Sequence, residues 1–274
     1  MHYQEIKNSK NTCIAKIYSF LDHSHKTSES LINDLNNQIK LSEIGFAGFE
    51  KKEYLPNFLK SYIFQGENIK NLEELNLETN KVIQIVEETF LICGKYIKNS
   101  KPTHIYIFPS YNKFTQEKLS GVTGFCPYTN VIHLFVNNNF KTKELKNTLA
   151  HEYNHSFIKH NWHNLLDSLI YEGLAQNFEE QITRKAAPSY ATKVNLEDCH
   201  KYFKVLKKDL QNTNLHNSVF FDYNEKSYPF WLGYSLGYQI VKSYLEKHPE
   251  KTWTEIIETP PQQILNDSSF NNTL

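Results

Sequence analysis

The stretch TLAHEYNHSF, residues 148–157, places two histidines four positions apart, with a glutamate directly after the first. In an α-helix, residues i and i+4 differ by about 40° and lie one turn apart, so His151 and His155 can direct their imidazoles at one point. Glu152 projects about 100° further round the same helix. If the segment is helical, it therefore presents two imidazoles together and one carboxylate beside them.

The flanking sequence supports the helix. TKELKNTLAHEYNHSFI, residues 142–158, carries an apolar stripe of Leu145, Leu149 and Tyr153. His151 and His155 lie roughly opposite this stripe, so they are not simply part of it. A pair of solvated or core histidines on an ordinary amphipathic helix is the alternative to a functional pair.

Two converging imidazoles are the geometry that two zinc ligands need, because imidazole supplies neutral nitrogen donors that leave the metal a good Lewis acid. Glu152 can then reach a water on the metal without being a ligand. Zinc lowers the pKa of that water, and a carboxylate can take its proton as it attacks a carbonyl. The motif therefore predicts a catalytic zinc site with Glu152 as its general base.

A catalytic zinc needs a third protein ligand and an open position. Glu172 is the best candidate, because it lies in LIYEGLAQNFEE (169–180), an otherwise apolar helical run in which an uncompensated carboxylate would be costly. Gly173 has no side chain, which lets another helix come close. His163 is the alternative third ligand and would have to come from the turn after the first helix. One zinc per chain is expected.

The composition is that of an ordinary globular protein. Lys plus Arg and Asp plus Glu both number 30, which argues against a role on nucleic acid or an anionic membrane that rests on bulk charge. No apolar run approaches the length of a membrane span, and the N-terminus lacks a secretory hydrophobic region. The four cysteines show no paired spacing. A protein of the cytoplasm with reduced thiols is expected.

The order of elements predicts an α+β fold. Strands are expected at 104–110 (HIYIFPS) and 131–137 (VIHLFVN), with a Gly- and Pro-rich connection over 121–130 between them. Helices are expected near 29–42, 78–97, 142–160, 165–183, 195–210, 230–247, 252–258 and 261–266. Residues 1–70 form an N-terminal segment of unknown role, and residues 71–274 form the catalytic domain.

The combination of HEYNH with IYEGLAQNF resembles the gluzincin branch of zinc metallopeptidases, and more narrowly the YjaZ-like family of predicted bacterial zinc-dependent proteases. Three further stretches carry the narrower resemblance: GVTGFCPYTNVIHLFVN before the motif, YPFWLGYSLGYQIVKSYL after it, and QQILNDSSF near the end. The similarity extends over about residues 80–270. It implies a zincin-like fold, with a small mixed sheet and a mainly helical C-terminal half.

The resemblance also implies roles for individual residues. His151, His155 and Glu172 would hold the zinc, and Glu152 would be the base. Tyr234 stands in the Y-x-x-G pattern that stabilises the oxyanion in related gluzincins, and a phenol donor suits that task; Tyr228 and Tyr238 are rivals.

One position departs from the pattern. Where some relatives carry an acid one turn after the glutamate ligand, this chain has Gln176, and Glu179 is a weak substitute.

These observations predict a zinc metallopeptidase acting on a peptide or protein, with no nucleic-acid or membrane partner. The strand over 131–137 could hold an extended peptide by main-chain hydrogen bonds, and it is equally a plain core strand. A non-catalytic zinc protein that binds or senses a partner is the alternative from another class. A zinc hydrolase of non-peptide amides is a third. Substrate identity, exo- or endopeptidase action and oligomeric state stay open.

Overall fold

The computed structural model describes residues 1–39, 54–98, 100–158, 164–184, 187–222 and 226–271. The chain divides into two compact units, Met1–Ser156 and Phe157–Leu274. The expected division at residues 70 and 71 does not coincide with this boundary. The first unit contains a five-stranded sheet with its covering helices, and the second is helical in the part that is described. The prediction of an α+β fold with a helical C-terminal half is confirmed.

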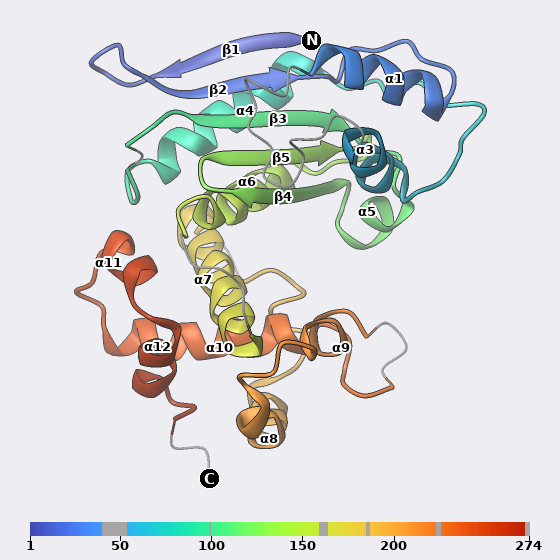
Figure 1. Cartoon of the computed structure of the whole chain (residues 1–274). Coiled ribbons are helices and arrows are strands. Elements are labelled where there is room, and N and C mark those ends of the chain that lie inside the picture. Colours follow the sequence, from blue (N-terminus) through green and yellow to red (C-terminus); the bar gives the residue numbers. More distant parts are fainter. Residues whose placement is uncertain (40–53, 99, 159–163, 185–186, 223–225, 272–274) are drawn as a thin grey trace. The chain divides into compact units, whose positions relative to one another are not determined.

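The sheet is mixed and has the strand order β1-β2-β3-β5-β4 (Figure 1). β1 (His2–Lys7) pairs antiparallel with β2 (Cys13–Ser19), which runs parallel to β3 (Thr103–Pro109). β3 is parallel to β5 (Val131–Val136), and β4 (Val122–Tyr128) closes the sheet antiparallel to β5. β4 is therefore an edge strand, whereas β5, the strand that directly precedes the HEYNH helix, lies inside the sheet.

Aromatic side chains fill one face of the sheet. Tyr18, Tyr106, Phe108 and Phe135 from three neighbouring strands pack with α1 (Ser28–Gln38) and α3 (Tyr54–Phe64) in one core cluster. Residues alternate between the two faces of a strand, so these positions share one face. The predicted strands at 104–110 and 131–137 are confirmed, and every residue of β5 is buried.

The prediction that residues 121–130 form a connection is wrong, because Val122–Tyr128 is strand β4. Both residues that suggested a turn have another explanation. A Cβ at Gly124 would overlap the side chain of Glu152, so the glycine makes room for that carboxylate. Pro127 falls where the pairing register shifts, between Phe125 and Tyr128. An edge strand tolerates proline there, because a bulge needs no ladder hydrogen bond from it.

α4 (Thr79–Cys93) and α6 (Thr142–His155) pack against each other, and α6 also contacts β4 and β5. Both helices are shorter than predicted. α4 ends at Gly94, and α6 ends at His155, whose cap Ser156 donates its backbone N–H to Glu152. The predicted residues 159 and 160 lie outside the described part. The tyrosine stripe of α6 is anchored, since Tyr153 donates its hydroxyl to the carbonyl of Ile97 at 2.6 Å.

Residues assigned to an N-terminal segment of unknown role supply part of this unit. β1 and β2 are two of the five strands, while α1 and α3 cover the aromatic face. The predicted helix over 29–42 is present as Ser28–Gln38 and begins with a capping box between Thr27 and Ser30. α5 (Lys113–Lys118) completes the described helices of the unit.

The second unit is built on the crossing of α7 (Leu165–Thr183) and α10 (Leu232–Lys247), which are in extensive contact. Two glycines form the crossing point. A Cβ at Gly173 would overlap the backbone of Gly237, and a Cβ at Gly237 would overlap the carbonyl of Leu169. Asn177 adds a bridge, donating to the carbonyls of Gly173 at 2.8 Å and Tyr238 at 3.1 Å. The expectation that Gly173 admits a second helix is confirmed.

Gly173→Ala is expected to lower the free energy of unfolding by about 2–3 kcal/mol, because the added methyl meets rigid backbone rather than a flexible side chain. Thermal or denaturant unfolding measures the loss. Gly94→Ala is the matched control, since its Cβ would meet only ordinary contacts of 3.5 Å or more at a φ of −64°. Equal stability of Gly173→Ala and wild type would contradict the close crossing.

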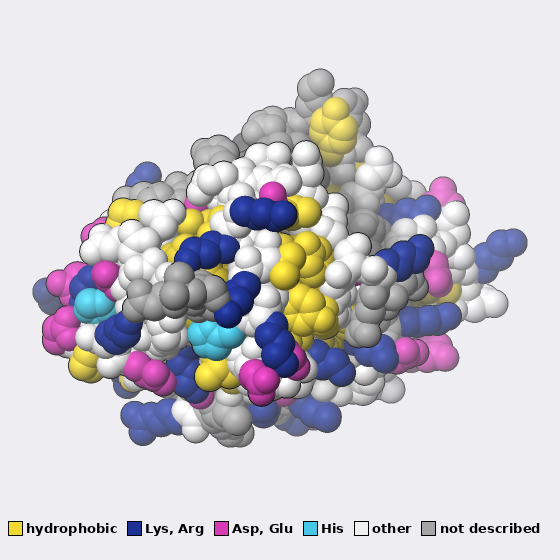
Figure 2. All heavy atoms as spheres, turned by 90° about the horizontal axis from the view of Figure 1, so that it is seen from below, with side chains coloured by type: hydrophobic (Ala, Val, Ile, Leu, Met, Phe, Trp, Pro, Cys, Tyr) yellow, Lys and Arg dark blue, Asp and Glu magenta, His cyan; other side chains and the backbone are white. Residues whose placement is uncertain are grey.

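The remaining helices of this unit are short or amphipathic. They are α8 (Leu196–Leu206) with a 3₁₀ turn over Lys207–Asp209, α9 (His216–Phe220), α11 (Trp253–Glu258) and α12 (Pro261–Asp267). Only α9 was not predicted. The face of the molecule in Figure 2 carries basic and acidic side chains with hydrophobic ones between them. None of the described helices has the length and apolar character that crossing a bilayer requires.

Candidate metal centre

The two histidines of the motif lie in the last two turns of α6 and are buried, with relative exposures of 9% for His151 and 5% for His155. Their ring centroids are 4.6 Å apart and the ring planes are almost perpendicular, at 89°. This is the i, i+4 arrangement that the sequence predicted. Because α6 ends at His155, the pair lies at the end of the helix.

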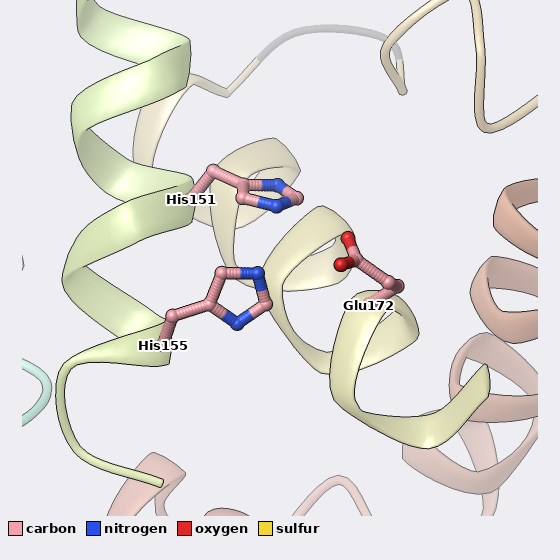
Figure 3. A group of neighbouring side chains, drawn as sticks. All are labelled: His151, His155 and Glu172. Carbon is pink, nitrogen blue, oxygen red and sulfur yellow. The ribbon is translucent and has the colours of Figure 1, made fainter. Parts of the chain in front are cut away.

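Glu172 lies near the middle of α7 and is 7% exposed. His151, His155 and Glu172 each offer a ligand atom, and these three atoms lie within 4.8 Å of one another. In the described part of the chain, they form the single group of three or more His, Cys, Asp or Glu side chains that meets this condition. Figure 3 shows the two imidazoles and the carboxylate directed toward the same space.

This donor set fits zinc. Two imidazole nitrogens and one carboxylate oxygen are a ligand combination of catalytic zinc sites, which keep a fourth position open. Ligand atoms around a tetrahedral zinc lie roughly 3.4 Å apart, so small side-chain rotations would bring this group into contact with the ion. The alternative ligand His163 lies outside the described residues.

Glu152 is buried beside the histidines, at 6% exposure, but is not a member of the ligand group. Its side chain lies against the backbone of Gly124 in the edge strand β4. α6 and β4 are also in contact along their length. The carboxylate next to the first histidine is therefore held at the edge of the sheet, where the sequence analysis had expected a loop.

Tyr234 lies in the first turn of α10, in the same unit as Glu172. Gln176 connects their helices: with its amide nitrogen facing two carbonyls, it donates to Glu172 at 3.3 Å and to Tyr234 at 3.0 Å. The position where an acid was expected thus carries an amide that fixes the backbone on both sides. Of the two rival tyrosines, Tyr238 directs its hydroxyl to Glu180 at 2.7 Å, and Tyr228 packs against Tyr202.

A further tyrosine, which the sequence analysis did not single out, lies in this cluster. The ring of Tyr190 meets that of Tyr234 edge to face at 5.4 Å, and its hydroxyl donates to Glu179 at 3.1 Å. Burial raises the pKa of Tyr190 well above its ordinary value, and the charges of Glu179 and Glu172 raise it further. Glu179 therefore has a fixed partner within the unit.

His216, which the sequence suggested was an ordinary residue, also lies in the electric field of Glu172. Burial lowers the pKa of His216, while the charge of Glu172 opposes that shift. The imidazole stacks on Phe220 at 4.7 Å, and Phe220 contacts the ring of Tyr234 at 5.0 Å. His216 and Tyr190 come from segments far from α7 in sequence, and no local spacing pattern marks them.

A two-histidine, one-glutamate group with an adjacent carboxylate defines a candidate zinc hydrolase centre. Comparison with protein families agrees: residues 82–266, more than half of the chain, match the family described as predicted Zn-dependent protease (DUF2268). The chain belongs to this family. A comparison with curated proteins gives no match. The matched segment contains all four motif residues and Tyr234, whereas β1, β2, α1 and α3 precede it.

Proposed function

We propose that the protein is a zinc metallopeptidase of the gluzincin type, similar to the YjaZ-like proteases. The observation that carries the proposal is the meeting of His151, His155 and Glu172 in one buried group, with Glu152 beside it. The third ligand is a glutamate on the next helix, which is the feature that distinguishes this type. A bound zinc ion would supply a Lewis acid that polarises the substrate carbonyl and lowers the pKa of water.

The chain's own residues then perform the proton transfers. Glu152 accepts the proton of the water that attacks the peptide carbonyl and passes it to the departing amine. The contact with Gly124 holds the Glu152 carboxylate in place, so little reorganisation is required. Tyr234 donates its phenol O–H to the oxyanion that develops at the carbonyl.

The edge strand β4 supports a peptide as the substrate. It is the last strand of the sheet, and one side of its backbone has no neighbouring strand among the described residues. An extended peptide can add to such an edge by main-chain hydrogen bonds. The strand expected for this task, β5, is internal and paired on both sides, so β4 takes its place.

The experiment that tests the function combines metal analysis with a peptide-library digest of the purified protein. We expect one zinc per chain and cleavage within a subset of the peptides. Stoichiometric zinc without cleavage of any peptide or protein would favour the alternative, a zinc protein that binds or senses a partner. Cleavage that continues after complete removal of metal would contradict the mechanism.

Tyr234→Phe is expected to keep the zinc and the fold but to lower kcat by about 10²–10³, the usual loss for one oxyanion donor. The measurement is kcat on the best library peptide, with zinc content alongside. Tyr238→Phe is the matched control on the same helix, because its hydroxyl is bound to Glu180 and Lys242. An unchanged kcat in Tyr234→Phe, with a loss in Tyr190→Phe instead, would assign the role to Tyr190.

A further inference from the structure

Tyr62 belongs to α3, a helix that lies outside the segment matching the family. Three aromatic side chains of the same unit fix its ring. The centroid distances are 4.7 Å to Phe58, 5.1 Å to Phe135 and 5.2 Å to Phe125. The first neighbour is on α3 itself, the second on the internal strand β5 and the third on the edge strand β4. The ring therefore has a defined position at the β4 side of the sheet.

The dipeptide Gly124–Phe125 of β4 connects Tyr62 to the candidate base. Gly124 lies against the side chain of Glu152, and Phe125 packs on the ring of Tyr62. Successive residues of a strand face opposite sides. The two side chains consequently flank the same short stretch of the edge strand, Glu152 on one side and Tyr62 on the other. A peptide added along this edge would pass between them.

The hydroxyl of Tyr62 is available for such a peptide. The residue is only partly buried and makes no hydrogen bond to the described part of the chain. Burial, and secondarily the negative charge of Glu152, raise the pKa of Tyr62 to about 12. The phenol is therefore protonated at neutral pH and can act as a donor.

We propose that Tyr62 is a substrate-binding residue, whose phenol O–H donates a hydrogen bond to a main-chain carbonyl of a peptide lying along the free edge of β4. This inference rests on the proposed peptidase function. It gives the N-terminal segment a task in the site, because α3 carries the donor and the aromatic face of the sheet holds it in place. The ring contacts with Phe58 and Phe135 explain why the donor is rigid.

Tyr62→Phe removes only the hydroxyl and keeps the ring contacts. We expect the variant to raise KM for the best library peptide about 3- to 10-fold, the usual worth of one neutral hydrogen bond, with kcat within about 2-fold of wild type. The same peptide, labelled and titrated into the metal-free protein, should show an equal rise in Kd by fluorescence anisotropy. Zinc content and thermal unfolding should not change.

Tyr111→Phe is the matched control. Tyr111 packs on Phe64 of α3, but its hydroxyl donates to the carbonyl of Glu73 at 3.1 Å. It should leave KM and Kd unchanged. Wild-type KM and Kd in Tyr62→Phe would overturn the assignment while leaving the peptidase intact, and so would equal losses in both variants. A wild-type protein that neither binds nor cleaves any peptide would instead refute the proposed function itself.

Discussion

The Glu152→Gln protein is expected to retain zinc at the wild-type level and to cleave peptides at least about 100-fold more slowly. A glutamine amide cannot accept the proton of the attacking water, and loss of general-base catalysis typically costs about 10²–10⁴ in rate. The measurements are zinc content by elemental analysis and the cleavage rate of the best library peptide. Together they separate the loss of a proton acceptor from the loss of a metal.

The surroundings of Glu152 make this substitution clean. Glutamine is nearly isosteric with glutamate, so the close contact with Gly124 can be kept and α6 need not move. Glu144→Gln removes a carboxylate from the first turn of the same helix, where Glu144 accepts a hydrogen bond from Asn147, and should cleave peptides like wild type. Wild-type cleavage by Glu152→Gln would rule out the mechanism, whatever the zinc content.

The parts of the site that follow local periodicity could be predicted from the sequence. The spacing of His151 and His155 determined their geometry, because a helix places i and i+4 side by side. Glu172 stood out because a carboxylate interrupted an apolar run, and it is buried. Helix α7 was predicted with its observed bounds for the same reason, since its periodic pattern extends over the whole of Leu165–Thr183.

β4 shows where local reasoning fails. Glycine and proline usually indicate turns, and the stretch 121–130 contains both. Here, Gly124 is required by the side chain of Glu152, and Pro127 falls at a register shift in an edge strand. Both causes are tertiary, and neither can be read from the residues around position 124. The substrate-binding strand was consequently placed one strand too far inside the sheet.

Contributions from distant segments could not be predicted for a related reason. Tyr190 reaches Tyr234 from a loop that Ser235 anchors, accepting from the N–H of Val194 at 3.1 Å and donating to the carbonyl of Tyr190 at 3.3 Å. Tyr62 lies 90 positions before Glu152 in the sequence, on a helix with no motif of its own. Spacing rules concern neighbours within one element, and these pairs are formed only by the fold.

The His151→Ala, His155→Ala double variant is expected to lose the zinc, with affinity weakened by more than about 100-fold. Each imidazole is one of only three protein donors in the group, and binding energy is shared among the ligands. Elemental analysis after dialysis measures the loss. Zinc that binds only the folded state stabilises it by about 2.7 kcal/mol at 100 times Kd, so added zinc should raise the Tm of wild type and not that of the variant.

His248→Ala is the control for this experiment, because His248 follows α10 and lies near Glu250 and Asp267 rather than in the ligand group. It should retain one zinc per chain and the zinc-dependent rise in Tm. Glu172→Ala should resemble the double variant if the carboxylate is the third ligand. Stoichiometric zinc in the double variant would show that the metal is held elsewhere. Because Glu152→Gln keeps the metal and the double variant loses it, the two variants separate the ligands from the base.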